Sequence, residues 1–426
     1  MTIIKYPLKS EWPYLLKRSI NDITAMADTV RKVLREVQTE GDAAVKRYER
    51  LFDKVELDSF QVSEEEIEEA GSLLSNELKE AIHTAKDNIE KFHEAQLFVG
   101  KKIETTPGVV CWQKAVAIEK VGLYVPGGTA PLFSTVLMLA VPARIAGCGE
   151  IILCTPPNPK GKVPAPILYA ARLAGVSKIF KIGGSQAIAA MAHGTETVPK
   201  VYKIFGPGNF YVTGAKLLAS LKDVAIDMPA GPSEVAVIAD ETANPDFIAA
   251  DFLSQAEHGV DSQSILLTTS EALAEKVTGT IEKQLLALSR REIAQKSLEN
   301  SRIIVLANMD EIIEFVNSYA PEHLIIQTAD YNELAERVVN AGSVFLGPYT
   351  PESAGDYASG TNHTLPTHGF AKAYSGVNLD SFVKKITFQE ITPDGLRQLG
   401  KTIMVMAEHE QLGAHKRAVS IRLEEE

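Results

Sequence analysis

Short apolar runs rich in β-branched residues alternate with helical segments between residues 115 and 347, and no other feature restricts the possible folds as much. The first series comprises AVAIEKVGLYVP, EIILCTPP, KIFKIGG and KVYKIFGPG. The second comprises EVAVIAD, QSILLTTS, RIIVLAN, HLIIQT and GSVFLG. Strands separated by helices form βαβ crossovers, which build parallel sheets covered on both faces. The sequence therefore predicts an α/β fold of two Rossmann-like, doubly wound units.

The chain has 426 residues, which is more than one ordinary core organises and favours several domains. The first hundred residues have helical periodicity, and the segment after Phe382 is also mostly helical in pattern. We expect small helical segments at the ends and early helices that join the second series of strands. The expected parts are an N-terminal segment over 1–20, a discontinuous first α/β domain over 21–123 and 237–378, a second α/β domain over 124–236, and a C-terminal helical segment over 379–426.

Charge and composition restrict the partners and the compartment. The formal net charge of −12 argues against nucleic acid, because phosphate binding needs clustered lysine and arginine. Neither a secretory signal nor an uncharged apolar run long enough for a membrane span is recognisable. The three cysteines have no zinc-finger or CxxC spacing, and such a sparse, odd number is typical of a reducing environment. We therefore expect a cytoplasmic protein that binds neither nucleic acid nor membrane.

Three strands of the first series end in glycine-rich loops, namely PGG (126–128), GGSQ (183–186) and GPGN (206–209). Such loops follow the carboxyl ends of strands, where open α/β sheets bind ligands. GPGNFY provides GxG without the third glycine, so the dinucleotide fingerprint is incomplete. A tight turn explains any one of these loops equally well. Three of them in one sheet favour a pyrophosphate site, because glycine lets backbone N–H groups approach phosphate closely.

Histidines and carboxylates gather in the second half of the chain. GDYASGTNHTLPTHG places His363 and His368 near Asp356, and LSQAEHG places Gln255 and His258 on one helix face at i, i+3. Imidazole and carboxylate on glycine- and proline-rich turns are typical of a metal or proton-transfer site, although a single histidine is more often structural. Spacing alone favours Glu257 over Gln255 as a ligand, because amide oxygen is an unusual metal donor.

Two further patterns are compatible with proton transfer or metal binding. In YAPEHL, Glu322 and His323 are adjacent at the start of a predicted strand, and the two groups titrate at different pH. In EHEQLGAHKRA, His409 and His415 flank a turn that contains glycine.

Several blocks occur in a fixed order: VGLYVPGGTAPLFSTVLMLAVPARIAGC, GPGNFYVTGAK, DMPAGPSE, LSQAEHG, APEHL, GDYASGTNHTLPT and AHKRAVSIR. This set resembles the histidinol dehydrogenase family of histidine biosynthesis over residues 25 to 422. The resemblance implies a four-electron oxidation of L-histidinol through L-histidinaldehyde to L-histidine, with two NAD⁺ and one zinc ion per subunit. It also implies a homodimer in which the C-terminal segment of each subunit reaches the site of the other.

The resemblance assigns roles to residues that match the family's motifs. Glu322 and His323 would be the acid/base pair. The other assignments form three sets: zinc ligands Gln255, His258, Asp356 and His415; substrate contacts Ser233, His363 and Glu410, together with the zinc ligands and His323; and NAD contacts Tyr124, Gln186 and Asn209.

Three alternatives remain open at this point. The same scaffold could oxidise a different alcohol, but His363 favours a substrate with an imidazole ring. A zinc-dependent hydrolase would use Glu322 to activate water but has no need of three glycine-rich strand ends. A non-catalytic metal-binding protein would have no use for an adjacent Glu–His pair.

Overall fold

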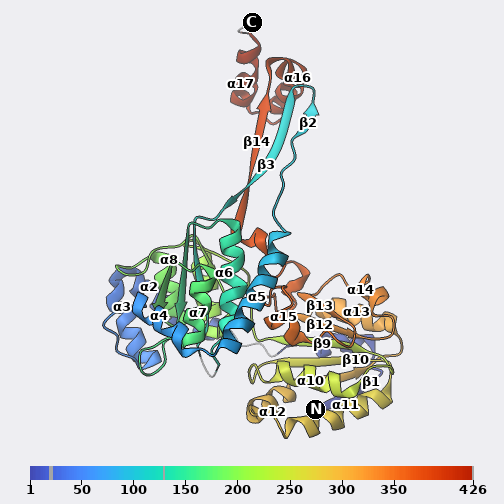
Figure 1. Ribbon diagram of the computed structural model, residues 1–426. Helices are drawn as coiled ribbons and strands as arrows, with labels where there is room; N and C mark the ends of the chain where they lie inside the picture. The colour runs from blue at the N-terminus through green and yellow to red at the C-terminus, as the bar shows by residue number, and fades with distance from the viewer. Residues whose placement is uncertain (19–22, 128–129, 425–426) are drawn as a thin grey trace.

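The computed structural model describes residues 1–18, 23–127 and 130–424. Two α/β units lie side by side, and a long ribbon of strands carries the C-terminal helices away from them (Figure 1). Four buried apolar clusters cover the two faces of the two sheets. Gly128 of the expected PGG loop and part of the expected boundary near residue 20 lie outside the described residues.

The first unit has a five-stranded parallel sheet of order β6-β5-β4-β7-β8. Counted from β4, this order is 3-2-1-4-5, as in a Rossmann unit. The sequence-based prediction of strands and intervening helices is confirmed here. The strands are β4 (Lys120–Tyr124), β5 (Glu150–Thr155), β6 (Lys178–Lys181), β7 (Lys203–Phe205) and β8 (Ala225–Ile226), and the helices are α6 (Phe133–Ala146), α7 (Ala165–Ala174), α8 (Gly184–His193) and α9 (Phe210–Ser220).

The helices of the first hundred residues pack on this five-stranded unit. Helix α2 (Ile23–Glu40) contacts α8 and α9, α4 (Glu64–Leu73) contacts α7, and α5 (Asn76–Glu94) contacts α6. Helix α3 (Asp42–Tyr48) continues into a π-helical turn, Glu49–Asp53. This arrangement differs from the expected grouping of residues 21–123 with 237–378. Periodicity predicts that a helix has an apolar face, but it does not identify the sheet that covers that face.

The second unit has a six-stranded parallel sheet of order β1-β11-β10-β9-β12-β13. The N-terminal segment, which was expected to stand apart, supplies edge strand β1 (Thr2–Lys5) and the short helix α1 (Trp12–Leu15). The remaining strands are β9 (Glu234–Ala239), β10 (Gln263–Thr268), β11 (Arg302–Val305), β12 (His323–Gln327) and β13 (Ser343–Leu346). The helices are α10 (Pro245–Ala256), α11 (Glu271–Leu285), α12 (Arg291–Glu299), α13 (Met309–Tyr319), α14 (Tyr331–Ala335) and α15 (Glu352–Tyr357).

A third sheet forms the ribbon that leaves the two units (Figure 1). Strand β14 (Val383–Ile391) pairs antiparallel with β3 (Val109–Ala117), which pairs with β2 (Ile103–Thr106). The expectation of a mostly helical segment after Phe382 is therefore wrong for β14 but correct for α16 (Pro393–His409) and α17 (Gly413–Glu424). Short 3₁₀ helices span Lys9–Glu11, Phe370–Lys372 and Leu379–Phe382. Within the described ranges, every helix is too short or too polar to cross a membrane.

Candidate active site

Three of the four expected metal ligands lie where two helices of the six-stranded unit end. Gln255 lies in the last turn of α10, His258 follows that helix, and Asp356 lies near the end of α15. One ligand atom from each of His258, Glu352 and Asp356 lies within 4.8 Å of the others. Gln255 is fully buried, and neither its Oε1 nor its Nε2 has a hydrogen-bond partner among the described residues. A buried amide without a partner is costly unless a further group binds it, and a cation would satisfy Oε1.

The direction of α10 makes this a favourable position for a cation. The carboxyl end of a helix carries partial negative charge, because its last carbonyl groups lack intrahelical partners. Glu352 and Asp356 add carboxylates beside the imidazole of His258, and oxygen and imidazole nitrogen are both zinc donors. The donor set in this chain therefore fits a divalent cation such as zinc.

Glu322 and His323 lie directly beside these ligands, at the start of β12. His323 Nε2 is 3.7 Å from Asp356 Oδ1, and its Nδ1 is 3.6 Å from carboxylate oxygens of both Glu322 and Glu352. The same oxygen of Glu322 that lies near His323, Oε2, accepts a hydrogen bond of 2.9 Å from the backbone N–H of Glu234 on the neighbouring strand β9. The predicted acid/base pair is thus held by the sheet at the edge of the ligand cluster.

Burial and charge change the acidity of both groups. Burial raises the pKa of Glu322 to about 8, although the charge of His323 opposes this. Burial lowers the pKa of His323, but the charges of Glu352, Glu322 and Asp356 outweigh burial and raise the pKa to about 10. Two adjacent proton-transfer groups with unusual pKa values are typical of a catalytic site.

Glu352 was not selected from the sequence. Its side chain is 1 % exposed, and burial raises its pKa well above the usual value. The spacing of Glu352 and Asp356 in PESAGDY is i, i+4, which places both on one helix face and could have identified it. Glu257, which spacing favoured as a ligand, caps the end of α10 and is absent from the cluster of potential ligands among the described residues.

The loops that were expected to contact substrate lie around this cluster. His363 donates from Nδ1 to the carbonyl of Asp356 at 2.9 Å, and its Nε2 lies 3.1 Å from the hydroxyl of Thr135 at the start of α6. Ser233 directly precedes β9, one residue before Glu234. His368 lies against Gly231, where an added Cβ would be 2.4 Å from the imidazole. The structure therefore brings Ser233 and His363 to the same region as the acid/base pair.

Two expected site residues lie elsewhere in this chain. Glu410 and His415 are exposed near the junction of α16 and α17, at the far end of the ribbon (Figure 1). They do not join the cluster of His258 and Asp356 within one subunit.

The expected NAD contacts lie at the carboxyl edge of the five-stranded sheet. The hydroxyl of Tyr124, at the end of β4, accepts a hydrogen bond of 3.1 Å from Gly184 N–H. Asn209 caps α9, and its side chain accepts hydrogen bonds from the N–H groups of Tyr211 and Val212. Gln186, in the first turn of α8, is fully buried, and its side-chain amide donates to the carboxylates of Glu49 and Asp53. The three residues thus lie around the loops that precede α8 and α9.

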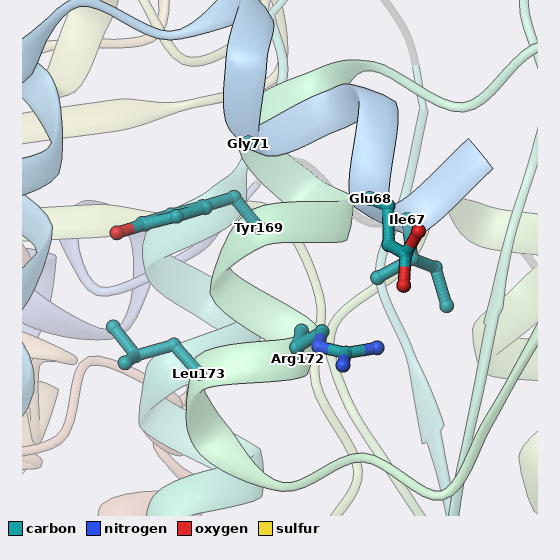
Figure 2. Close-up of a pocket in the computed structure, with 6 residues that line it drawn as sticks. All are labelled: Ile67, Glu68, Gly71, Tyr169, Arg172 and Leu173. Atoms are coloured by element: carbon teal, nitrogen blue, oxygen red, sulfur yellow. The ribbon is translucent and has the colours of Figure 1, made fainter. Parts of the chain in front are cut away.

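A hollow between α4 and α7 lies away from this chemistry (Figure 2). It contains none of the expected site residues, and its lining is largely apolar. The lining residues are Ile67, Glu68, Gly71, Tyr169, Arg172 and Leu173.

Comparison with known proteins supports the resemblance found in the sequence. The histidinol dehydrogenase family model matches residues 16–423. Histidinol dehydrogenase of Bacteroides thetaiotaomicron is 66 % identical over 423 residues, which is 99 % of each chain. Histidinol dehydrogenase of Bacteroides fragilis is 65 % identical over 425 residues, covering 100 % of this chain and 99 % of the relative.

A solved structure agrees with these relatives. Histidinol dehydrogenase from Elizabethkingia anophelis has a TM-score of 0.98 and 53 % identity, and the match covers 100 % of this chain and 98 % of that one. The agreement in sequence and fold extends over both α/β units and the ribbon. The chain therefore belongs to the histidinol dehydrogenase family, which confirms the family identified from its motifs.

Proposed function

We propose that this chain oxidises L-histidinol to L-histidine through L-histidinaldehyde, the last step of histidine biosynthesis, with two NAD⁺ and one zinc ion per subunit. The observation that supports this most strongly is the position of the Glu322–His323 pair beside His258, Asp356 and the unpartnered amide of Gln255. A proton-transfer pair next to a cation site is what oxidation of an amino alcohol requires.

Gln255, His258 and Asp356 would hold the zinc ion from this subunit. Zinc, when bound, would orient the substrate through its imidazole and amine nitrogens and polarise its oxygen. Ser233, His363 and Glu410 would contact the substrate as well. Holding the reactants in place can lower the barrier by roughly 7–11 kcal/mol.

The acid/base pair divides the proton transfers. His323, in its neutral form, takes the hydroxyl proton while the carbinol carbon loses a hydride, which gives the aldehyde. Glu322, in its ionised form, takes a proton from water as that water attacks the aldehyde, and the aldehyde oxygen gains a proton to give the neutral hydrate. The hydrate then loses a second hydride and one proton to give the carboxylic acid, which releases a further proton as the carboxylate. NAD⁺ would accept one hydride in each step, at loops contacted by Tyr124, Gln186 and Asn209.

We also propose that a second copy of the chain completes each site with Glu410 and His415. The ribbon supports this, because every residue of β14 after Val383 is exposed in the single chain. Its exposed apolar side chains include Ile386, Phe388 and Ile391, which are 38–40 % exposed. Strand β2 pairs only with the first residues of β3, so most of the ribbon is two-stranded. An isolated two-stranded ribbon is marginally stable in water, so a partner that covers it is expected.

Mixing two inactive variants tests the shared site. His258→Ala and His415→Ala should each be inactive as homodimers, because each lacks one zinc ligand. A heterodimer has one site with both changes and one site with neither. Co-refolding in equal amounts should therefore restore about one quarter of wild-type activity. If the mixture stays inactive while mass spectrometry detects heterodimers, His415 does not act in the partner's site.

The stoichiometry of NADH tests the reaction itself. Purified protein with NAD⁺ and limiting histidinol should form two NADH for each histidinol, followed by absorbance. One NADH per substrate would indicate an enzyme that oxidises only an alcohol, and no NADH would contradict the proposed function.

We further propose a cytoplasmic location. Cys111, Cys148 and Cys154 are all free, as expected for a protein of a reducing compartment. Trapping thiols in intact cells and measuring their redox state by mass shift would test this, and a disulfide among them would contradict it.

A further inference from the structure

The five-stranded sheet lacks a carboxylate at the position where a Rossmann unit usually carries one. In the order 3-2-1-4-5, an Asp or Glu at the carboxyl end of the second strand hydrogen-bonds the ribose 2′-hydroxyl of NAD. The second strand here is β5, which is followed by Pro156, Pro157 and Asn158. None of these three residues is acidic.

A carboxylate from another part of the chain lies at this place. Asp53 ends the π-helical turn after α3 and is partly exposed. An ideal Cβ on Gly183, two residues after β6, would lie 3.2 Å from Asp53 Oδ2 and 2.7 Å from Pro156 Cβ. Asp53 and Pro156 therefore meet around Gly183, beside the carboxyl ends of β5 and β6.

The carboxylate of Asp53 is held by buried neighbours. Gln186 Nε2 donates to Asp53 Oδ2 at 3.1 Å and to Glu49 Oε1 at 2.8 Å. Glu49 is 1 % exposed, and its Oε1 also accepts from Gly183 N–H at 3.2 Å. Both donors on the Gln186 amide nitrogen are thus used within the protein, so Gln186 acts as a positioning residue for Asp53.

We propose that Asp53 recognises the 2′-hydroxyl of the adenosine ribose and excludes a 2′-phosphate, so that it selects NAD over NADP. This rests on the proposed function, in that the dinucleotide binds at the carboxyl edge of the five-stranded sheet. A carboxylate accepts hydrogen bonds from a ribose hydroxyl, whereas a phosphate at the same place is repelled by its charge.

The charge of the Glu49–Asp53 pair agrees with a role of Asp53 in binding the ribose. Burial, together with the nearby charge of Asp53, raises the pKa of Glu49 to about 8, so Glu49 is mostly protonated at neutral pH. The pair then carries about one negative charge, and the partly exposed Asp53 is the member that can present it to a ligand.

Asp53→Asn, prepared as the zinc-loaded full-length protein, tests the proposal by calorimetric titration with NAD⁺ and NADP⁺. NAD⁺ affinity should fall roughly 10- to 100-fold, because a charge-assisted hydrogen bond is lost, and the preference for NAD⁺ over NADP⁺ should shrink. The zinc content should stay unchanged. Asp58→Asn is the matched control, because Asp58 is an exposed carboxylate in the same segment and should leave both affinities unchanged.

Two outcomes separate this inference from the proposed function. If the wild type binds NAD⁺ but Asp53→Asn has the same NAD⁺/NADP⁺ preference, Asp53 is not the selecting residue. If the wild type neither binds NAD⁺ nor forms NADH, the proposed function itself fails. Should Asp53→Asn fold poorly, Asp53→Ser removes the same charge with a smaller side chain, and an unchanged preference in that variant overturns the inference.

Discussion

Replacing Glu49 by glutamine tests whether a buried carboxyl group makes the five-stranded unit less stable as the pH rises. Glu49 is 1 % exposed and accepts hydrogen bonds from Gly183 N–H and Gln186 Nε2. Burial and the nearby Asp53 raise its folded-state pKa to about 8, whereas an unfolded glutamate titrates near about 4.3. Glutamine is neutral at every pH and retains an oxygen that can accept both hydrogen bonds.

The direction of the pH effect on stability depends on which state of the protein binds the Glu49 proton. Between about pH 4.3 and about pH 8 the folded state holds the Glu49 proton and the unfolded state releases it, so stability falls as pH rises. The slope is at most about 1.4 kcal/mol per pH unit, so the wild type should lose about 2–3 kcal/mol between about pH 6 and about pH 8. For a unit of this size the loss lowers the thermal midpoint by roughly 4–12 °C.

Thermal midpoints of the wild type, Glu49→Gln and Glu56→Gln across this pH range, without nucleotide, measure the effect. The midpoint of the wild type should fall relative to that of Glu49→Gln as pH rises. Glu56 is a suitable control because its side chain is 78 % exposed and pairs with Arg50, so Glu56→Gln should follow the wild type. Parallel curves for the wild type and Glu49→Gln would refute the reasoning.

Three further predictions concern the site and the packing behind it. Glu322→Gln and His323→Ala should each keep zinc by metal analysis but lower NADH formation about 10²–10⁴-fold, and near-normal rates for both oxidation steps would contradict the assigned roles. Removing zinc with a chelator should stop both steps and adding zinc should restore them, whereas full activity in metal-free protein would exclude a zinc role. Arg18→Met should destabilise the protein by about 3–5 kcal/mol in thermal unfolding, because it leaves Glu234 buried without its cation. The double variant with Glu234→Gln should recover part of that loss, and a midpoint no higher than that of Arg18→Met would count against this account.

The core of the fold could be predicted from the sequence because each buried strand and each covering helix has its own local pattern. The ribbon could not be predicted in this way. The pattern of AVAIEKVGLYVP predicts one strand, but in the structure this segment contributes to both β3 in the ribbon and β4 in the five-stranded sheet. Strand β14 is exposed along almost its whole length, so it lacks the regular burial that a strand pattern reports. Packing between distant segments decides such cases, and local periodicity does not contain that information.

The residue types of the candidate site could be predicted from the sequence, but the residues that surround them could not. The motifs that contain His258, Glu322, His323 and Asp356 were evident, and the structure brings these four side chains together. Glu352 was missed, although it lies four residues before Asp356, a spacing that places both residues on one helix face. Glu49 and Asp53 carry no local signal, because each becomes informative only through its contact with Gln186, more than a hundred residues away.

The two sheets present opposite edges to the proposed reaction, and the helices explain why. In the five-stranded unit, α8 and α9 begin at the carboxyl edge, where helix amino ends carry partial positive charge that suits a pyrophosphate. In the six-stranded unit, the candidate ligands lie at the amino edge, where α10 ends and partial negative charge suits a cation. The sequence predicted ligand-binding loops at the carboxyl edge of the first unit, and it placed Glu322 and His323 at the start of a strand in the second.

The two edges are linked by the loop that carries His363. Its imidazole contacts Thr135 at the start of α6, and Asn362 Nδ2 donates to the carbonyl of Met138 in the same helix at 2.6 Å. Helix α6 follows β4, so this loop fixes the carboxyl edge of one sheet against the metal side of the other. A substrate held by the ligands of one unit can meet a nicotinamide held by the other only if that relative placement is kept. The contacts between the units are therefore as much a part of the proposed site as the ligands themselves.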